Sequence, residues 1–156
     1  MNITIIAVGK LKERYWTEAC NEYLKRCRPY AKLAVRELAD IDPGSVGGID
    51  EVLSREGEAI ISAIPERAHV VALAIEGKQK SSEEFSAWFD EQAVSGTSDI
   101  VFIIGGSYGL SREVLKRAHS HLSFGRNTLP HNLMRVILLE QIYRAFKISR
   151  GEPYHK

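Results

Sequence analysis

The chain has 156 residues, of which 44% are hydrophobic and 26% charged, and its net charge is +1 at pH 7. A chain of this size can bury enough surface to fold as one domain, residues 1–156, without disulfides or metal. The near-neutral charge argues against tight, indiscriminate binding to nucleic acid, because that affinity grows with the number of phosphates neutralised.

Apolar runs and helical patterns alternate along the whole chain. In order, they predict a strand at Ile3–Val8, a helix at Trp16–Cys27, a weaker strand at Ala34–Leu38, a helix at Asp50–Ile64, a strand at His69–Ile75, a helix at Phe85–Ala93, a strand at Ile100–Ile104, a helix at Arg112–His119 and a long helix at Pro130–Ile148. Three of the strands are continuous apolar runs, which is typical of parallel strands buried on both faces. The alternation predicts an α/β fold: a mainly parallel sheet with helices on both faces.

Neither export nor a membrane span is expected. Ile3–Val8 is too short for a secretory signal. The apolar stretch from Leu133 is interrupted by Arg135, Glu140 and Arg144, so no run approaches the ~20 residues of a span. We expect a soluble, cytoplasmic protein without membrane contact.

The cysteines and histidines do not predict a redox or metal site. Cys20 and Cys27 would lie about 10 Å apart on one helix, too far for a disulfide, so we expect buried, reduced thiols. No Cys/His set has zinc spacing. His119 and His121, two residues apart in a predicted helix, would point in different directions.

Charge is distributed unevenly. From Arg112 onward the chain carries nine Lys/Arg and three Asp/Glu, a net +6, whereas residues 1–111 carry −5. A basic C-terminal third is compatible with contact to RNA phosphates and equally with a solvated helix surface.

The turn Gly105–Gly109 follows a buried strand and precedes a helix capped by Ser111. Open α/β sheets bind ligands at the carboxyl ends of their strands, and glycine allows close approach to the backbone. A tight turn that needs positive φ is the alternative. The glycine spacing does not fit the dinucleotide-binding motif.

The last helix is apolar around most of its circumference, which requires burial on more than one side. We therefore expect a homodimer that buries this helix, in which a charge at Leu139 or Ile142 would disrupt the interface. The tail after the helix ends in Tyr154, His155 and Lys156, where a frayed terminus would normally carry solvating residues.

The TLPH loop, the RVILLEQIYRAFKI helix and the GEPYHK ending resemble the bacterial large-subunit ribosomal RNA pseudouridine N3-methyltransferases. The likeness extends to ITIIAVGKLKE, VVALAIEGK and VFIIGGSYGLS, and so covers essentially the whole chain. This family belongs to the SPOUT class of knotted methyltransferases. The resemblance implies a deep C-terminal trefoil knot, a homodimer, and transfer of a methyl group from S-adenosylmethionine to N3 of a pseudouridine in 23S ribosomal RNA.

The resemblance also implies a cofactor site. Leu73, which by itself would be a core leucine, joins the glycine turn and the loop before the last helix. The implied cofactor-binding residues are Leu73, Gly105, Phe124, Gly125, Arg126, Asn127, Thr128 and Leu129. Backbone groups in such loops can bind the adenine edge while leucines pack on its faces.

The resemblance assigns the substrate site to Arg144, Tyr154 and His155. Tyr154 could stack on a base, and His155 could contact phosphate or handle a proton. Arg144 could instead pair with Glu140 one turn earlier. His131, at the positive end of a helix, is more typical of a structural histidine.

The expected partner is the assembled ribosome, through a stem-loop of the large-subunit RNA at the subunit interface; DNA is not expected. Two alternatives stay open. One is a ribosome-binding assembly factor that transfers no methyl group, and the other is a SPOUT enzyme acting on transfer RNA ribose. Cofactor binding separates the first from an enzyme.

Overall fold

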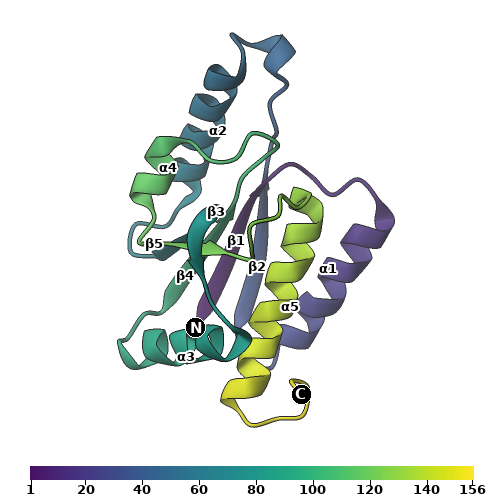
Figure 1. Cartoon of the computed structure of the whole chain (residues 1–156), viewed down its shortest axis with the longest axis vertical. Coiled ribbons are helices and arrows are strands. Elements are labelled where there is room, and N and C mark those ends of the chain that lie inside the picture. Colours follow the sequence, from purple (N-terminus) through teal and green to yellow (C-terminus); the bar gives the residue numbers. More distant parts are fainter.

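A computed structural model describes all of residues 1–156, and its centre is a five-stranded sheet in the order β2-β1-β4-β3-β5 (Figure 1). Every strand pair in it is parallel. The elements are β1 (Asn2–Val8), α1 (Arg14–Cys27), β2 (Lys32–Leu38), the 3-10 turn η1 (Pro43–Ser45), α2 (Ile49–Ala63), β3 (His69–Gln79), α3 (Ser82–Val94), β4 (Asp99–Ile104), α4 (Arg112–Arg117), β5 (Ser120–Ser123) and α5 (His131–Ser149).

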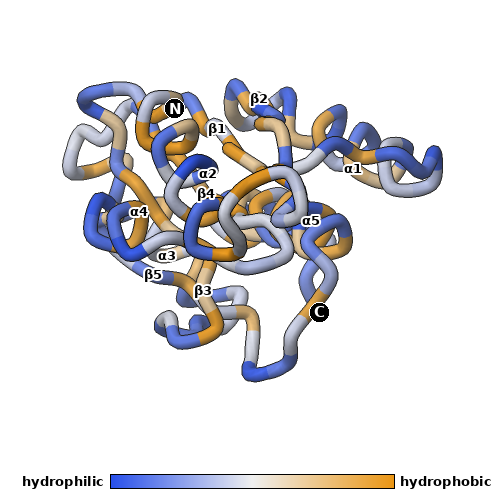
Figure 2. The backbone as a smooth tube through the Cα atoms, turned by 90° about the horizontal axis from the view of Figure 1, so that it is seen from above, coloured by the Kyte–Doolittle hydropathy of each residue, from blue (hydrophilic) through white to orange (hydrophobic).

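Helices cover both faces of the sheet, which confirms the predicted α/β fold. Alternate residues of β1 point to opposite sides, so Ile5 joins a core beneath α1, α3 and α5, while Ile6 joins a second core beneath α2 and α4. Figure 2 shows hydrophobic residues concentrated along the central strands β1 and β4. This two-sided burial explains why the central strands are continuous apolar runs.

Local signals locate several helix ends. Ser81 and Glu84 form a capping box at the start of α3, in which Ser81 Oγ accepts from the Glu84 amide and Glu84 accepts from the Ser81 amide. Ser111 caps α4 through the Val114 amide. Both thiols are free and buried as predicted, and burial raises the pKa of Cys27 to about 12. None of the helices combines the length and hydropathy that crossing a membrane requires.

The predicted helix Arg112–His119 is too long, because α4 ends at Arg117 and the chain then forms β5. The prediction about the two histidines is therefore wrong, since neither lies in a helix. His119 Nδ1 accepts a hydrogen bond from the Val70 amide at 2.9 Å, and His121 Nε2 lies 2.9 Å from the Leu115 carbonyl. A four-residue strand with two serines and a histidine has no periodic signal; it forms because β3 offers an edge to pair with.

Strand β3 continues to Gln79, four residues beyond the predicted end at Ile75, through an irregularity. Leu122 of β5 is in register with both Leu73 and Lys78, so the residues between them bulge out of the ladder. Gly77 allows the bulge to pass this close to β5, because the Cβ of any other residue at this position would lie 2.7 Å from the Leu122 carbonyl carbon. The sheet order does not itself establish the trefoil knot, which stays a prediction.

Candidate active site

A cavity of about 740 Å³ lies at the carboxyl ends of β3 and β4. Its walls come from the β3 bulge, the glycine turn after β4, the loop after β5 and the first turn of α5. Seven of the eight residues expected to bind cofactor line it: Leu73, Gly105, Phe124, Gly125, Asn127, Thr128 and Leu129. Arg126 is the exception and lies outside the lining.

The glycine turn is stabilised by a hydrogen bond between its own backbone groups. The Gly109 amide donates to the Gly106 carbonyl at 3.1 Å, and Gly109 has a φ of +83°. A Cβ at Gly105 would lie 2.5 Å from the Gly109 carbonyl oxygen. Gly105 is thus needed both for the tight turn and for the cavity wall, and a larger side chain there would distort the turn as well as fill the cavity.

The loop after β5 is also held by local hydrogen bonds. Ser123 Oγ accepts from the Gly125 amide at 3.2 Å and donates to the Gly125 carbonyl at 3.0 Å, and Gly125 has a φ of +123°. The volume and the mixed lining of leucines, backbone groups and small polar side chains fit an organic cofactor such as S-adenosylmethionine. The residues that would hold it come from separate loops that the sheet brings together.

A buried carboxyl group lies behind the glycine turn. Glu56 of α2 is 5% exposed, and its Oε1 accepts from the Ile41 amide at 3.0 Å, whereas its Oε2 has no partner. A Cβ at Gly106 would lie 3.1 Å from that Oε2. Burial raises the pKa of Glu56. Its burial could not be predicted from the residues around it, since a glutamate in an amphipathic helix is normally solvated.

The second residue missed from the sequence is Arg135, which is 1% exposed. Its guanidinium donates to the Gly9 carbonyl at 2.9 Å and lies 3.3 Å from a Glu37 carboxylate oxygen, which also accepts from the Leu11 amide at 3.0 Å. Arg135 therefore ties the start of α5, one wall of the cavity, to the loop after β1.

Arg135→Ala is expected to lower the free energy of unfolding by about 2–4 kcal/mol, because it removes a charge-assisted hydrogen bond and leaves a cavity in the core. Arg135→Met keeps most of the volume and is expected to lose less, since apolar replacement of buried ions is often tolerated. Urea unfolding of both variants measures the difference. An alanine variant as stable as wild type would show that Arg135 is not a structural tie.

The structure brings Arg144, Tyr154 and His155 together at the other end of α5. The Arg144 guanidinium lies 4.7 Å from the centre of the Tyr154 ring, and its Nη1 lies 3.2 Å from His155 Nδ1. Glu140 accepts from both Arg144 Nε and the Tyr154 hydroxyl at 3.0 Å. The alternative considered for Arg144, pairing with Glu140, is thus present within a larger cluster, and the tail is folded against α5.

The neighbours of His155 in this cluster have well-defined protonation states. His155 Nε2 lies 2.8 Å from a Glu83 carboxylate oxygen. Hydrogen bonds from the Glu83 backbone amide, Ser81 and His155 lower the pKa of Glu83 to about 2, so this neighbour stays negative. Burial, reinforced by the bonds to Tyr23 and Glu140, raises the pKa of Tyr154. The tyrosine therefore stays protonated and acts as a donor.

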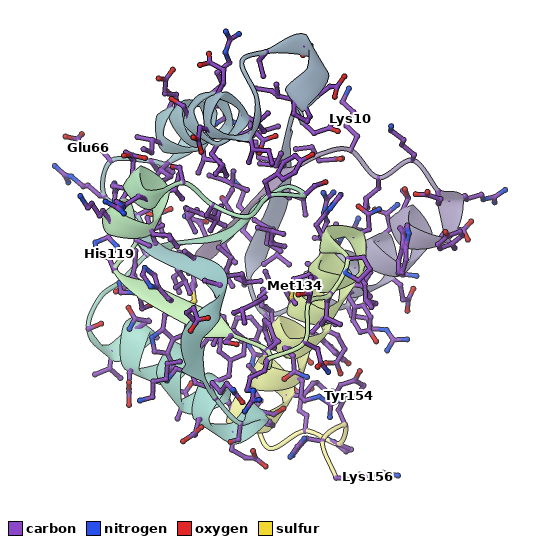
Figure 3. The ribbon with its side chains drawn as sticks, turned by 45° about the horizontal axis from the view of Figure 1, so that its top comes forward. Lys10, Glu66, His119, Met134, Tyr154 and Lys156 are labelled. Carbon is purple, nitrogen blue, oxygen red and sulfur yellow. The ribbon has the colours of Figure 1, made fainter.

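Within one chain, the cluster and the cavity are separate. Met134 lines the cavity, and Arg144 follows ten residues later on α5, which corresponds to about 15 Å along the helix axis. Figure 3 shows Met134 near the start of α5 and Tyr154 beside its far end. The expected cofactor residues and the expected substrate residues thus do not meet within one chain.

Helix α5 is only partly covered by its own chain. Leu139 and Ile142 are fully buried in the core under the sheet, so the expectation that they lie at a subunit interface is wrong. Leu133, Ile137 and Ile148 are half-buried and belong to neither core. With Arg144 they follow helical spacing along one outward stripe, which is called here the α5 stripe.

Comparison with known proteins gives a consistent result. Residues 1–155 match the family model described as predicted SPOUT methyltransferase. A ribosomal RNA large subunit methyltransferase H from Carboxydothermus hydrogenoformans is 57% identical over 159 aligned residues, covering 100% of both chains. Proteins of the same name from Listeria monocytogenes and Bacillus cereus are each 54% identical, again over 100% of both chains.

Proposed function

This chain belongs to the SPOUT methyltransferase family, and we propose that it methylates N3 of a pseudouridine in large-subunit ribosomal RNA, with the assembled ribosome as substrate. The family uses S-adenosylmethionine as methyl donor. The observation that best supports the proposal is the single cavity lined by seven of the eight residues that the resemblance assigned to the cofactor. A ribosomal substrate places the protein in the cytoplasm.

Leu73, Leu129 and the backbone of the glycine turn would hold the cofactor in this cavity. When bound, the cofactor supplies an electrophilic sulfonium methyl group. The walls would exclude water and fix the direction of approach, and the target nitrogen must come within ~3 Å along that direction. Positioning is therefore the main contribution of the cavity residues.

The active site would be completed by a second subunit. The α5 stripe offers Leu133 and Ile137 as an apolar contact, and a twofold contact between antiparallel helices places the end of one α5 beside the start of the other. The tail of one subunit then lies near the cavity of its partner, which closes the gap of about 15 Å along the helix. The dimer is thus part of the site.

Ile137→Glu is expected to produce a monomer that retains its fold, because Ile137 is outside both cores and a charge on an apolar subunit contact is unfavourable. Sedimentation velocity over a range of concentrations measures this, with circular dichroism to check the fold. A wild-type protein that sediments as a monomer at every concentration would contradict the dimer.

Methylation of N3 also requires that the nitrogen lose its proton. His155 is the candidate base in the tail cluster, because an imidazole nitrogen can accept a proton. Arg144 lies 3.2 Å from its Nδ1 and Glu83 lies 2.8 Å from its Nε2, so the Arg144 contact must open before Nδ1 can take the proton of N3. Tyr154, kept protonated, would contribute its ring face and hydroxyl to the target nucleotide.

Transfer of radiolabelled methyl groups tests the function. Purified protein is incubated with labelled S-adenosylmethionine and either ribosomes lacking the modification, naked large-subunit RNA or transfer RNA. Label in the ribosomes is the expected result. Label in transfer RNA alone would favour a ribose methyltransferase, and ribosome binding without calorimetric binding of the cofactor would favour an assembly factor.

A further inference from the structure

Two of the few large hydrophobic side chains left exposed to solvent line the cofactor cavity. The exposed residues are Tyr15, Ile49, Ile61, Ile75, Val94 and Tyr108. Of these, Ile75, which is 47% exposed, and Tyr108, which is 42% exposed, also line the cavity. They come from different segments, the β3 bulge and the glycine turn. The mouth of the cavity therefore presents apolar side chains to solvent from two separate segments of the chain.

Tyr108 differs from the other tyrosines of the chain. Each of the others lies against another aromatic ring: Tyr15, Tyr23, Tyr30, Tyr143 and Tyr154. Tyr108 has no such contact, and no side-chain hydrogen bond holds its hydroxyl. Its backbone, by contrast, is fixed between the bridged residues Gly106 and Gly109. An exposed ring on a fixed turn loses little conformational entropy when it binds, since only two side-chain torsions remain to be ordered.

We propose that Tyr108, with Ile75 beside the same mouth, forms the surface on which the target nucleobase or its neighbour in the RNA stacks. The inference rests on the proposed function and adds a substrate-binding residue on the cofactor side of the site. A nucleobase fits because its flat face suits an exposed aromatic ring, whereas its polar edges stay free for hydrogen bonds. The cofactor is a poorer occupant, since the ring lies at the solvent-exposed rim.

The test compares Tyr108→Ala, Tyr108→Phe and, as matched control, Tyr15→Ala, whose tyrosine is 62% exposed and outside the cavity lining. Methyl transfer to ribosomes lacking the modification is measured at saturating S-adenosylmethionine, and cofactor affinity is measured by calorimetry. Tyr108→Ala is expected to raise the KM for ribosomes about 5- to 150-fold, the usual effect of removing one stacking ring, with unchanged cofactor affinity. Tyr108→Phe and Tyr15→Ala are expected to behave as wild type.

Three outcomes would overturn the inference. An unchanged KM in Tyr108→Ala would show that the ring does not contact RNA. Weaker cofactor binding in that variant would assign the ring to the cofactor pocket. A Tyr108→Phe variant as impaired as Tyr108→Ala would show that the hydroxyl, not the stacking face, is used. Wild-type activity on the same ribosomes tests the proposed function separately, so its failure is distinguishable from these results.

Discussion

Removal of Tyr154–Lys156 is expected to slow methyl transfer by about 10²–10⁴-fold, the usual loss when a positioned acid–base group is removed. Cofactor binding and dimerisation are expected to survive, because the cavity is formed upstream and the α5 stripe is left in place. Single-turnover kinetics at saturating enzyme measure the chemical step, and calorimetry measures cofactor affinity. His155→Ala should reproduce most of the loss if the imidazole accepts the proton.

The same experiment separates two roles for the tail. If His155 only contacts RNA phosphate, His155→Ala will show weak ribosome binding that higher enzyme concentration rescues. Arg150→Ala is a suitable control, since Arg150 is exposed and lies over the Tyr30 ring rather than in the tail cluster. Full activity of the truncated protein would remove the tail from the active site altogether.

A mixture of two inactive variants is expected to recover activity if the site is shared between subunits. One partner lacks Tyr154–Lys156, and the other carries Ala74→Trp, which places a large ring in the cavity wall. Random exchange makes half of the dimers mixed, and each mixed dimer has one intact site of two, so about a quarter of wild-type activity should return. Each variant alone should be inactive.

Activity returns in the mixed dimer because one subunit supplies the cavity and the other supplies the tail. In a mixed dimer the truncated subunit has an open cavity and its partner has an intact tail, so the pair can form one complete site. If each tail served its own cavity, no subunit in the mixture would have both parts and no activity would return. Refolding the two variants together, with a sample mixed without subunit exchange as control, distinguishes these cases.

Much of the fold could be predicted because the central strands are buried on both faces, which leaves continuous apolar runs at Ile3–Val8 and Ile100–Ile104. The short strand β5 could not be predicted, since Ser120–Ser123 has no periodic signal and forms a strand only by pairing with β3. The β3 bulge was missed for a related reason: the close approach at Gly77 depends on a strand from elsewhere in the chain.

Family resemblance predicts the cofactor-binding residues, and the structure adds buried and exposed groups that the sequence pattern alone does not reveal. Glu56 and Arg135 look like solvated charges on helices, yet both are buried, and only their contacts with Ile41 and Gly9 reveal it. Tyr108 looks like an ordinary turn residue until the turn is seen at the cavity mouth. The apolar circumference of a helix does not show which face its own chain covers, and the prediction that Leu139 contacts a partner subunit is wrong for that reason.

Mapping the modified nucleotide tests the central claim most directly. Purified protein is incubated with S-adenosylmethionine and ribosomes from a strain that lacks the enzyme, and the new methyl group is located by mass spectrometry of the digested RNA. The expected result is a single new methyl group on N3 of a pseudouridine in the large-subunit RNA. A methyl group on any other nucleotide, or none on ribosomes that the protein demonstrably binds, would contradict it.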